Sequence, residues 1–380
     1  MELAFGVLVG LLILVFLVVV HELGHAISAR RNGVVVEEFG IGFPPRAWSK
    51  RLKNGILFTL NWLPLGGFVR LKGEHDAANE KGDYGAATFW QKTRILLAGV
   101  FINWLVAAGL LTILALAGLP KILPNQFSIP NDTTLVKQPV EIASLTPKYP
   151  AEQAGFKVND TIVRFAGQEV PTVERLLELT HENQGKDVEV IYSRNGVENS
   201  RHVTLRPNET GAVFGAGLAQ RESIRATWSA PIVGIATTGQ FTWVTLQGLG
   251  DLVGNLSRGL VSQFSSDQSA RQQGSEELKT VSENVAGPIG ILGVIFPAAQ
   301  QAGFTQLVFL TAIISLTLAV MNILPIPALD GGRWFVMTLF KLSKKELTKE
   351  REEKIQATGF VILMLLIILV TIGDVGKLFR

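Results

Sequence analysis

Five consecutive residues near the amino terminus have the types and the spacing of a metal centre. They read His21-Glu22-Leu23-Gly24-His25, which is an H-E-x-x-H pattern. Side chains four residues apart lie on one face of a helix, so both imidazoles can bind the same metal ion. Glu22 lies beside them and can take a proton from a water molecule at that metal. The pattern predicts zinc-dependent hydrolysis, with Glu22 as the general base.

The third ligand of this predicted site must come from elsewhere in the chain. A catalytic zinc usually has three protein ligands and one open position. The sequence holds no cysteine, which excludes thiolate ligands and disulfides, and it holds only five histidines. The remaining histidines, His75, His181 and His202, lie in polar segments that are expected to face water. We therefore expect a carboxylate, and Asp330 is the best candidate.

Asp330 stands in a segment that is unusual for the end of an apolar helix. The segment reads Asn322-Ile323-Leu324-Pro325-Ile326-Pro327-Ala328-Leu329-Asp330-Gly331-Gly332. Its prolines break a helix, and its paired glycines permit a tight backbone. Broken helices at membrane depth are tolerated where they line a cavity in the protein. An ordinary aspartate in a helix-ending turn is the alternative interpretation.

The elements that must position these residues are predicted to be membrane helices. Hydrophobic residues make up 47% of the 380 residues and charged residues only 18%. A bilayer core needs about 20 apolar residues in a helix. Four apolar runs approach this length, at residues 3–20, 95–119, 304–324 and 358–372. A cleaved signal peptide is the alternative for the first run, but Glu2 precedes it and no A-x-A-like site follows.

Charge bias predicts how these helices are oriented. The segments that follow the first and the third apolar run, residues 30–94 and 341–354, are rich in lysine and arginine. Loops of this kind stay on the cytoplasmic side. The segment between the second and third spans should then face outward, as should both termini. The first and third spans would run in the same direction, so Asp330 would lie at the level of the two histidines.

The region between the second and third spans has three parts. Residues 121–222 carry frequent charges and turn signals, which predicts a mostly β soluble domain with a helix at Val173–Glu182. Residues 224–263 have apolar side chains at three- and four-residue spacing, interrupted by polar ones. We expect amphipathic helices on the membrane surface, or alternatively helices packed on the soluble domain. Residues 265–283 are polar and are predicted to form a loop.

In the first cytoplasmic loop, residues 56–60 and 68–71 are expected to be short strands.

These motifs resemble the site-2 protease family of intramembrane zinc metalloproteases, in its bacterial regulator-of-sigma-E protease type with a PDZ domain. The likeness covers nearly the whole chain. It rests on the H-E-x-x-H in the first span and on the N-x-x-P-x-P-x-L-D-G pattern after the third. Two further segments support it, namely Pro64-Leu65-Gly66-Gly67-Phe68-Val69-Arg70 and Gly287-Pro288-Ile289-Gly290.

The resemblance implies a role for each site residue. His21, His25 and Asp330 would bind one Zn²⁺ per chain, with Glu22 as the catalytic base. The substrate backbone would be held by Asn322, Gly66 and Gly67, where membrane-associated β-hairpins can pair with an unwound substrate as an added strand. Family members often have G-F-G-P where this chain has Gly42-Phe43-Pro44-Pro45. We therefore expect that loop to differ in geometry.

The outward domain resembles a single PDZ domain, on the run from Pro150-Ala151-Glu152-Gln153-Ala154-Gly155 to Asp160-Thr161-Ile162. PDZ domains bind an extended peptide as an extra strand. In this family the domain is thought to act mainly as a size filter against untrimmed substrates. Peptide sensing is the second interpretation.

The expected fold class is a multi-pass α-helical membrane protein with about four transmembrane helices, membrane-associated β-hairpins and an inserted PDZ domain. Its expected parts are an N-terminal membrane part (1–120), the PDZ domain (121–222), amphipathic helices with a linker (223–302) and a C-terminal membrane part (303–380). The implied location is the bacterial inner membrane, with the PDZ domain on the extracytoplasmic side.

The implied function is cleavage of transmembrane segments in regulated intramembrane proteolysis. The implied substrates are single-pass proteins that an upstream site-1-type protease has already trimmed, such as anti-sigma factors or signal-peptide remnants. The lipid bilayer is the other partner, and nucleic acid is not expected. Two other functions compete with this one. A catalytically silent PDZ scaffold would be favoured if a ligand or the base were missing, and a transporter would be favoured by internal repeats, which are not visible here.

Overall fold

The computed structural model describes residues 2–194, 196–207, 213–265 and 267–378. The chain divides into two compact units. One unit combines residues 1–113 with residues 234–380, and the other consists of residues 114–233. The first unit holds every residue of the predicted metal site.

Four long helices of the described chain are long and apolar enough to cross a membrane. They are α1 (Glu2–Arg31), α2 (Phe89–Ala117), α9 (Phe304–Ile323) and α11 (Lys349–Leu378). The four predicted apolar runs lie in these helices, except that the second and third runs extend one or two residues past the ends of α2 and α9. The expected helices are therefore confirmed. Helices α1, α2 and α11 are longer than their apolar runs, because helix-forming charged or polar residues continue the helix beyond the apolar core.

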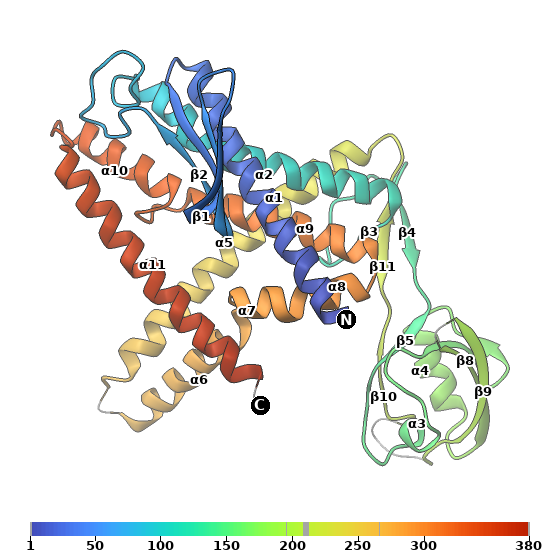
Figure 1. The fold of residues 1–380 in the computed structure, drawn as a ribbon. Coiled ribbons are helices and arrows are strands. Elements are labelled where there is room, and N and C mark those ends of the chain that lie inside the picture. Colours follow the sequence, from blue (N-terminus) through green and yellow to red (C-terminus); the bar gives the residue numbers. More distant parts are fainter. Residues whose placement is uncertain (1, 195, 208–212, 266, 379–380) are drawn as a thin grey trace. The chain divides into compact units, whose positions relative to one another are not determined.

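Two long strands, β1 (Val36–Arg51) and β2 (Leu57–Leu71), fold back on each other (Figure 1). Glu38 to Ile41 of β1 pair on one side with residues 67–70 and on the other side with residues 57–60. The second half of β1 pairs with residues 57–61. The separate short strands predicted at 56–60 and 68–71 are therefore parts of one bent strand. Residues 67–71 form a sheet edge, and β2 packs along α1.

The chain that follows the second unit is helical. It contains α5 (Ala230–Ser262) and α6 (Gln268–Asn284). The expectation of a helix within residues 224–263 is confirmed for α5, whereas residues 224–225 belong to a strand. The expectation of a loop at 265–283 is wrong. Asp267 caps α6 by accepting a hydrogen bond from the Ser269 backbone N–H at 3.0 Å, and Gly259 and Gly274 allow α5 and α6 to touch.

A short apolar helical stretch follows and packs against the first span. It comprises α7 (Pro288–Gly290), the π-helical turn η1 (Ile291–Ile295) and α8 (Phe296–Gln301). A side chain at Gly6 or Gly10 of α1 would collide with Pro297 and Phe296, so these glycines allow close packing. Asp374 of α11 accepts the backbone N–H groups of Gly287 and Gly290, at 3.0 and 2.8 Å, which ties the end of α11 to this stretch.

The second unit is mostly β. Its larger sheet has the order β10-β5-β6-β8-β9, with β7 paired to β6, and its smaller sheet has the order β3-β11-β4. The strands of the larger sheet are β5 (Val140–Leu145), β6 (Thr161–Phe165), β7 (Gln168–Glu169), β8 (Asp187–Arg194), β9 (Val197–Thr204) and β10 (Ala216–Ala219). Those of the smaller sheet are β3 (Leu119–Pro120), β4 (Thr134–Lys137) and β11 (Glu222–Arg225), and the unit also contains α3 (Pro150–Gln153).

The helix predicted at Val173–Glu182 is confirmed as α4, and Thr172 caps it. The core of the unit is formed by buried apolar side chains that include Ile142, Phe165 and Leu179. Asp160 is buried beside Arg194. Burial alone would raise the pKa of Asp160, but hydrogen bonds from Arg194 and from the Lys157 backbone hold it below its usual value.

Candidate metal centre

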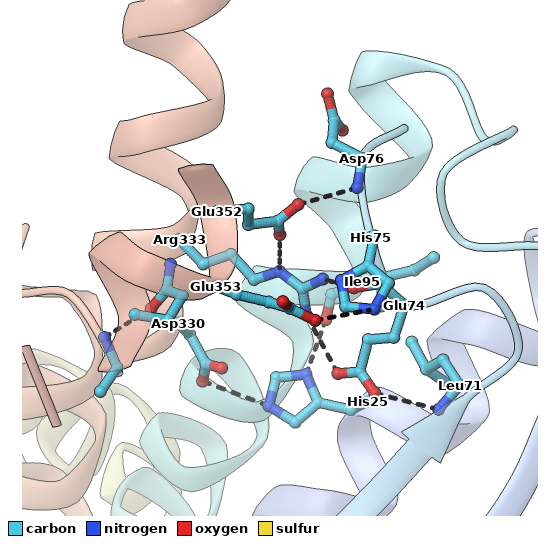
Figure 2. Close-up of polar contacts among 12 residues, drawn as sticks. His25, Leu71, Glu74, His75, Asp76, Ile95, Asp330, Arg333, Glu352 and Glu353 are labelled. Carbon is cyan, nitrogen blue, oxygen red and sulfur yellow. Dashed lines mark hydrogen bonds and ion pairs between the residues drawn. The ribbon is translucent and has the colours of Figure 1, made fainter. Parts of the chain in front are cut away.

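Three side chains from the two ends of the sequence converge in the first unit. His21 and His25 lie on α1, and their Nε2 atoms are 3.1 Å apart. Asp330 Oδ2 lies 3.0 Å from His21 Nε2 and 3.2 Å from His25 Nε2 (Figure 2 shows His25 and Asp330). Both histidines are buried and Asp330 is half-buried. Within the described chain these residues form a group that could hold a metal ion.

The geometry of this group fits zinc. Ligand bonds of 2.0–2.1 Å in a tetrahedron place two ligand atoms about 3.3 Å apart. The three observed separations, 3.0 to 3.2 Å, are close to that value. His25 Nδ1 lies 2.8 Å from the carbonyl oxygen of Ile95, which only accepts. His25 Nδ1 therefore carries the proton, and Nε2 presents its lone pair to the group.

A tight turn between two helices brings Asp330 to the histidines. Helix α9 ends at Ile323, and the next helix, α10 (Asp330–Leu342), begins at Asp330 itself. A Cβ atom at Gly331 would lie 2.1 Å from the Ile323 carbonyl oxygen, and one at Gly332 would lie 1.9 Å from that of Ile326. Only glycine fits at these two positions, so the predicted tight backbone is confirmed.

Gly99 of α2 is a residue of the site that the sequence analysis missed. A Cβ atom there would lie 2.4 Å from His25 Nε2 and 2.7 Å from His21 Nε2. The absence of a side chain at Gly99 therefore leaves open the space into which the ligand atoms point. A single glycine in an apolar helix is usually a helix contact, so no local signal marks this one as part of the site.

Asn103, one turn further along α2, also lies next to the histidines. A polar side chain in an apolar helix needs a partner inside the protein, and Asn103 is fully buried with its amide 3.5 Å from His21 Nδ1. Its Oδ1 has no hydrogen-bond partner in the described chain. If the amide is turned over, Oδ1 accepts the proton of His21 Nδ1, which leaves Nε2 free for a metal.

Glu22 faces a cavity of about 210 Å³ that His25 and Asp330 also line. Phe68 and Val69 of β2 also line this cavity. A Cβ atom at Gly67 would lie 3.5 Å from Glu22 Cγ, so the sheet edge runs directly past this carboxylate. The arrangement places a potential base, two potential ligands and the edge of the sheet around one small space.

The other predicted site residues lie further out. Gly66 has a left-handed φ of +84°, and a side chain there would meet the Phe43 ring. Asn322 is half-buried in the last turn of α9 and is not among the residues that line the cavity.

The remaining histidines have local partners. His75 lies 3.7 Å from Glu353, His202 lies 2.9 Å from Asp187, and His181 contacts Gln184.

Comparison with known proteins agrees with this geometry. The model of the family described as Peptidase family M50 matches residues 9–366. A predicted zinc metalloprotease of Clostridium perfringens is 31% identical, over 94% of this chain and 95% of its own length. The zinc metalloprotease RasP of Geobacillus kaustophilus is 27% identical, and the regulator of sigma-W protease RasP of Bacillus subtilis is 24% identical. Each alignment covers 96% of both chains.

A solved PDZ domain of an SdrC-like protein from Listeria monocytogenes matches 21% of this chain and 87% of its own, at 17% identity and a TM-score of 0.20.

The chain belongs to peptidase family M50, the site-2 protease family, as the sequence resemblance predicted. It is a zinc metalloprotease with helices that can span a membrane.

Proposed function

We propose that this chain is an intramembrane zinc endopeptidase that cleaves transmembrane segments of single-pass membrane proteins. One observation carries the proposal. The potential ligands His21, His25 and Asp330 meet within 3.2 Å of one another, and two of them lie on a helix that is apolar enough to span a bilayer. Polar and ionisable groups in such a helix are costly and generally functional.

The residues of the site divide the reaction between them. His21, His25 and Asp330 would hold one zinc ion, which when bound polarises the scissile carbonyl and activates water. Glu22 takes the proton of the attacking water and later delivers it to the nitrogen of the leaving amine. Its place on the shared cavity, beside His25 and Asp330, suits this transfer.

The edge of the β-sheet is the proposed substrate-binding surface. Residues 38–41 are paired with strand segments on both sides, whereas in the described chain residues 67–71 pair with a strand on one side only, and Gly67 lies against Glu22. An unwound substrate segment can add to such an edge as a further strand, with its backbone held next to the base. Gly66 and Gly67 would admit the substrate backbone, and Asn322 would hold it near the metal.

The hairpin formed by β1 and β2 has two chemically different ends. Phe43 pairs with Leu63 at one end, where Trp62 is 71% exposed. Lys50, Arg51 and Lys53 are exposed at the other end. We propose that the aromatic end enters the membrane and that the cationic end stays at the cytoplasmic surface.

The proposed substrates are membrane proteins that another protease has already trimmed, such as anti-sigma factors or signal-peptide remnants. The name of the Bacillus subtilis relative, which refers to sigma-W, supports this class. The proposed location is the bacterial inner membrane. The β-rich unit would be an extracytoplasmic PDZ domain, within the boundaries 121–222 expected from the sequence, and it would exclude untrimmed ectodomains.

The decisive test is a cleavage assay with a truncated single-pass substrate in liposomes, combined with measurement of bound zinc. We expect the wild type to cut within the membrane segment. Glu22→Gln should retain zinc, because the residue is not a ligand, and should lose at least about 1,000-fold in rate. Glu350→Gln, at an exposed position of α11, is the matched control and should cut normally.

Each outcome has a distinct meaning. Cleavage by the wild type and not by Glu22→Gln supports both the enzyme and the role of Glu22. Equal cleavage by both removes Glu22 from the mechanism. A wild type that binds no zinc and cuts nothing would support the PDZ scaffold instead.

A further inference from the structure

A buried ion cluster lies one helical turn beyond the proposed ligand Asp330. Its centre is Arg333 of α10, whose side chain is only 19% exposed. The guanidinium contacts two carboxylates, Glu74 Oε1 at 3.0 Å and Glu352 Oε1 at 3.1 Å. It also lies over the ring of Tyr84, at 4.5 Å from the ring centre. Figure 2 shows Arg333 between the two carboxylates, beside Asp330.

The two carboxylates also hold the backbone of neighbouring elements. Glu352, near the start of α11, accepts the Asp76 backbone N–H at 2.8 Å. Glu74 lies 3.4 Å from the backbone N–H of Leu71, the last residue of β2, and Arg333 donates to the Glu74 carbonyl oxygen. Arg333 therefore joins α10 to the following helix, α11, and to the end of β2, which is far from both helices in the sequence.

This cluster shares a wall with the metal site. Glu74, Tyr84 and Arg333 line the same cavity as Glu22, His25 and Asp330. Asp330 is the first residue of α10, and no side chain caps the amino-terminal end of that helix. The position of Asp330 relative to the histidines therefore depends on how neighbouring elements fix α10. Arg333 is a charged side chain that fixes the first turn of α10 through its ion pairs.

We propose that Arg333 is a positioning residue for Asp330, which acts by locking the first turn of α10 against β2 and α11. This inference rests on the proposed role of Asp330 as a metal ligand. Buried ion pairs often contribute little net stability, but some of them define one geometry among several. A metal ligand must be held within a few tenths of an ångström of its binding position, so a fixed geometry at Asp330 favours metal binding even where it adds little stability.

The test compares zinc affinity with thermal stability in the full-length protein in detergent. Arg333→Met leaves the buried Glu352 without a counter-charge, so we expect it to lower the melting temperature. The double variant Arg333→Met/Glu352→Gln removes one positive and one negative charge, and the new amide oxygen at position 352 would still accept the Asp76 N–H. We expect its melting temperature to recover, while its zinc affinity, measured by competition with a chromogenic chelator, stays about tenfold or more below that of the wild type.

Because the double variant keeps the net charge, its zinc affinity reports geometry rather than altered electrostatics. Arg351→Met, an exposed arginine on α11, is the matched control and should leave zinc affinity unchanged. Recovery of zinc affinity together with stability in the double variant would overturn the inference, because Arg333 would then have a structural role only. A wild type without zinc affinity would overturn the proposed function itself, which is a separate result.

Discussion

The space at the proposed metal site is made by a residue that has no side chain. Gly99 of α2 faces His21 and His25 at distances that no Cβ atom could occupy without a collision. The ligand atoms themselves come from α1 and α10. At the scale of single residues, the site depends as much on an empty position as on the groups that bind.

A substitution at Gly99 should therefore remove the metal while keeping the helix. Gly99→Ala adds one methyl group at 2.4 Å from His25 Nε2, and we expect bound zinc, measured on the purified protein by mass spectrometry, to fall close to zero. Gly109→Ala on the same helix is the matched control, because a Cβ atom there meets nothing within 4 Å. If Gly99→Ala retained a full equivalent of zinc, the metal would have to lie elsewhere.

At the scale of elements, the double pairing of β1 sets the geometry of the site. Because the first half of β1 is paired on both sides, residues 67–71 form the edge of the sheet next to Glu22. The same folding separates an aromatic end of the hairpin from a cationic end. One supersecondary element thus supplies the proposed strand edge and the proposed membrane contact.

The hairpin can be tested by labelling, because the chain has no native cysteine. Trp62→Cys and Lys53→Cys, each carrying an environment-sensitive dye, would be reconstituted in liposomes. We expect lipid-borne quenchers to quench the dye at position 62 and to leave the dye at position 53 in water, because only the aromatic end enters hydrocarbon. Equal exposure of both dyes to water would argue against insertion.

At the scale of the whole molecule, one chain combines a unit with membrane-length helices and a β-rich unit, Leu114–Val233. The proposed topology assigns the cationic loops to the cytoplasm and the β-rich unit to the outside, because lysine and arginine stay on the inner side. The metal site, near the carboxyl-terminal end of α1, would then belong to the cytoplasmic half of the bilayer.

The orientation has a direct test in intact cells. Ser200→Cys lies at an exposed position of β9, and Lys344→Cys lies between α10 and α11, also exposed. A membrane-impermeant maleimide should label position 200 once the outer membrane or wall is permeable, and should label position 344 only after lysis. The reverse pattern would invert the proposed topology.

Much of this protein was predictable from local sequence patterns. The four apolar helices, the helix at Val173–Glu182 and the H-E-x-x-H pair on one helix face follow from periodicity, caps and run lengths. The tight turn before Asp330 follows from its prolines and glycines. The polar helix α6 was missed because its composition resembles a loop, and a cap together with contact to α5 stabilises it.

The tertiary structure decided what meets at the site. The contact between His21 and Asp330 joins residues 309 positions apart in the chain, and local spacing rules do not relate residues at that separation. The roles of Gly99 and Arg333 depend on neighbours from other parts of the chain, so their own sequence surroundings carry no signal for the site. The sequence alone therefore determined which groups can do the chemistry, because donor type and helix spacing are local. Only packing between distant elements decided their geometry, because the space at a site belongs to all the helices that enclose it.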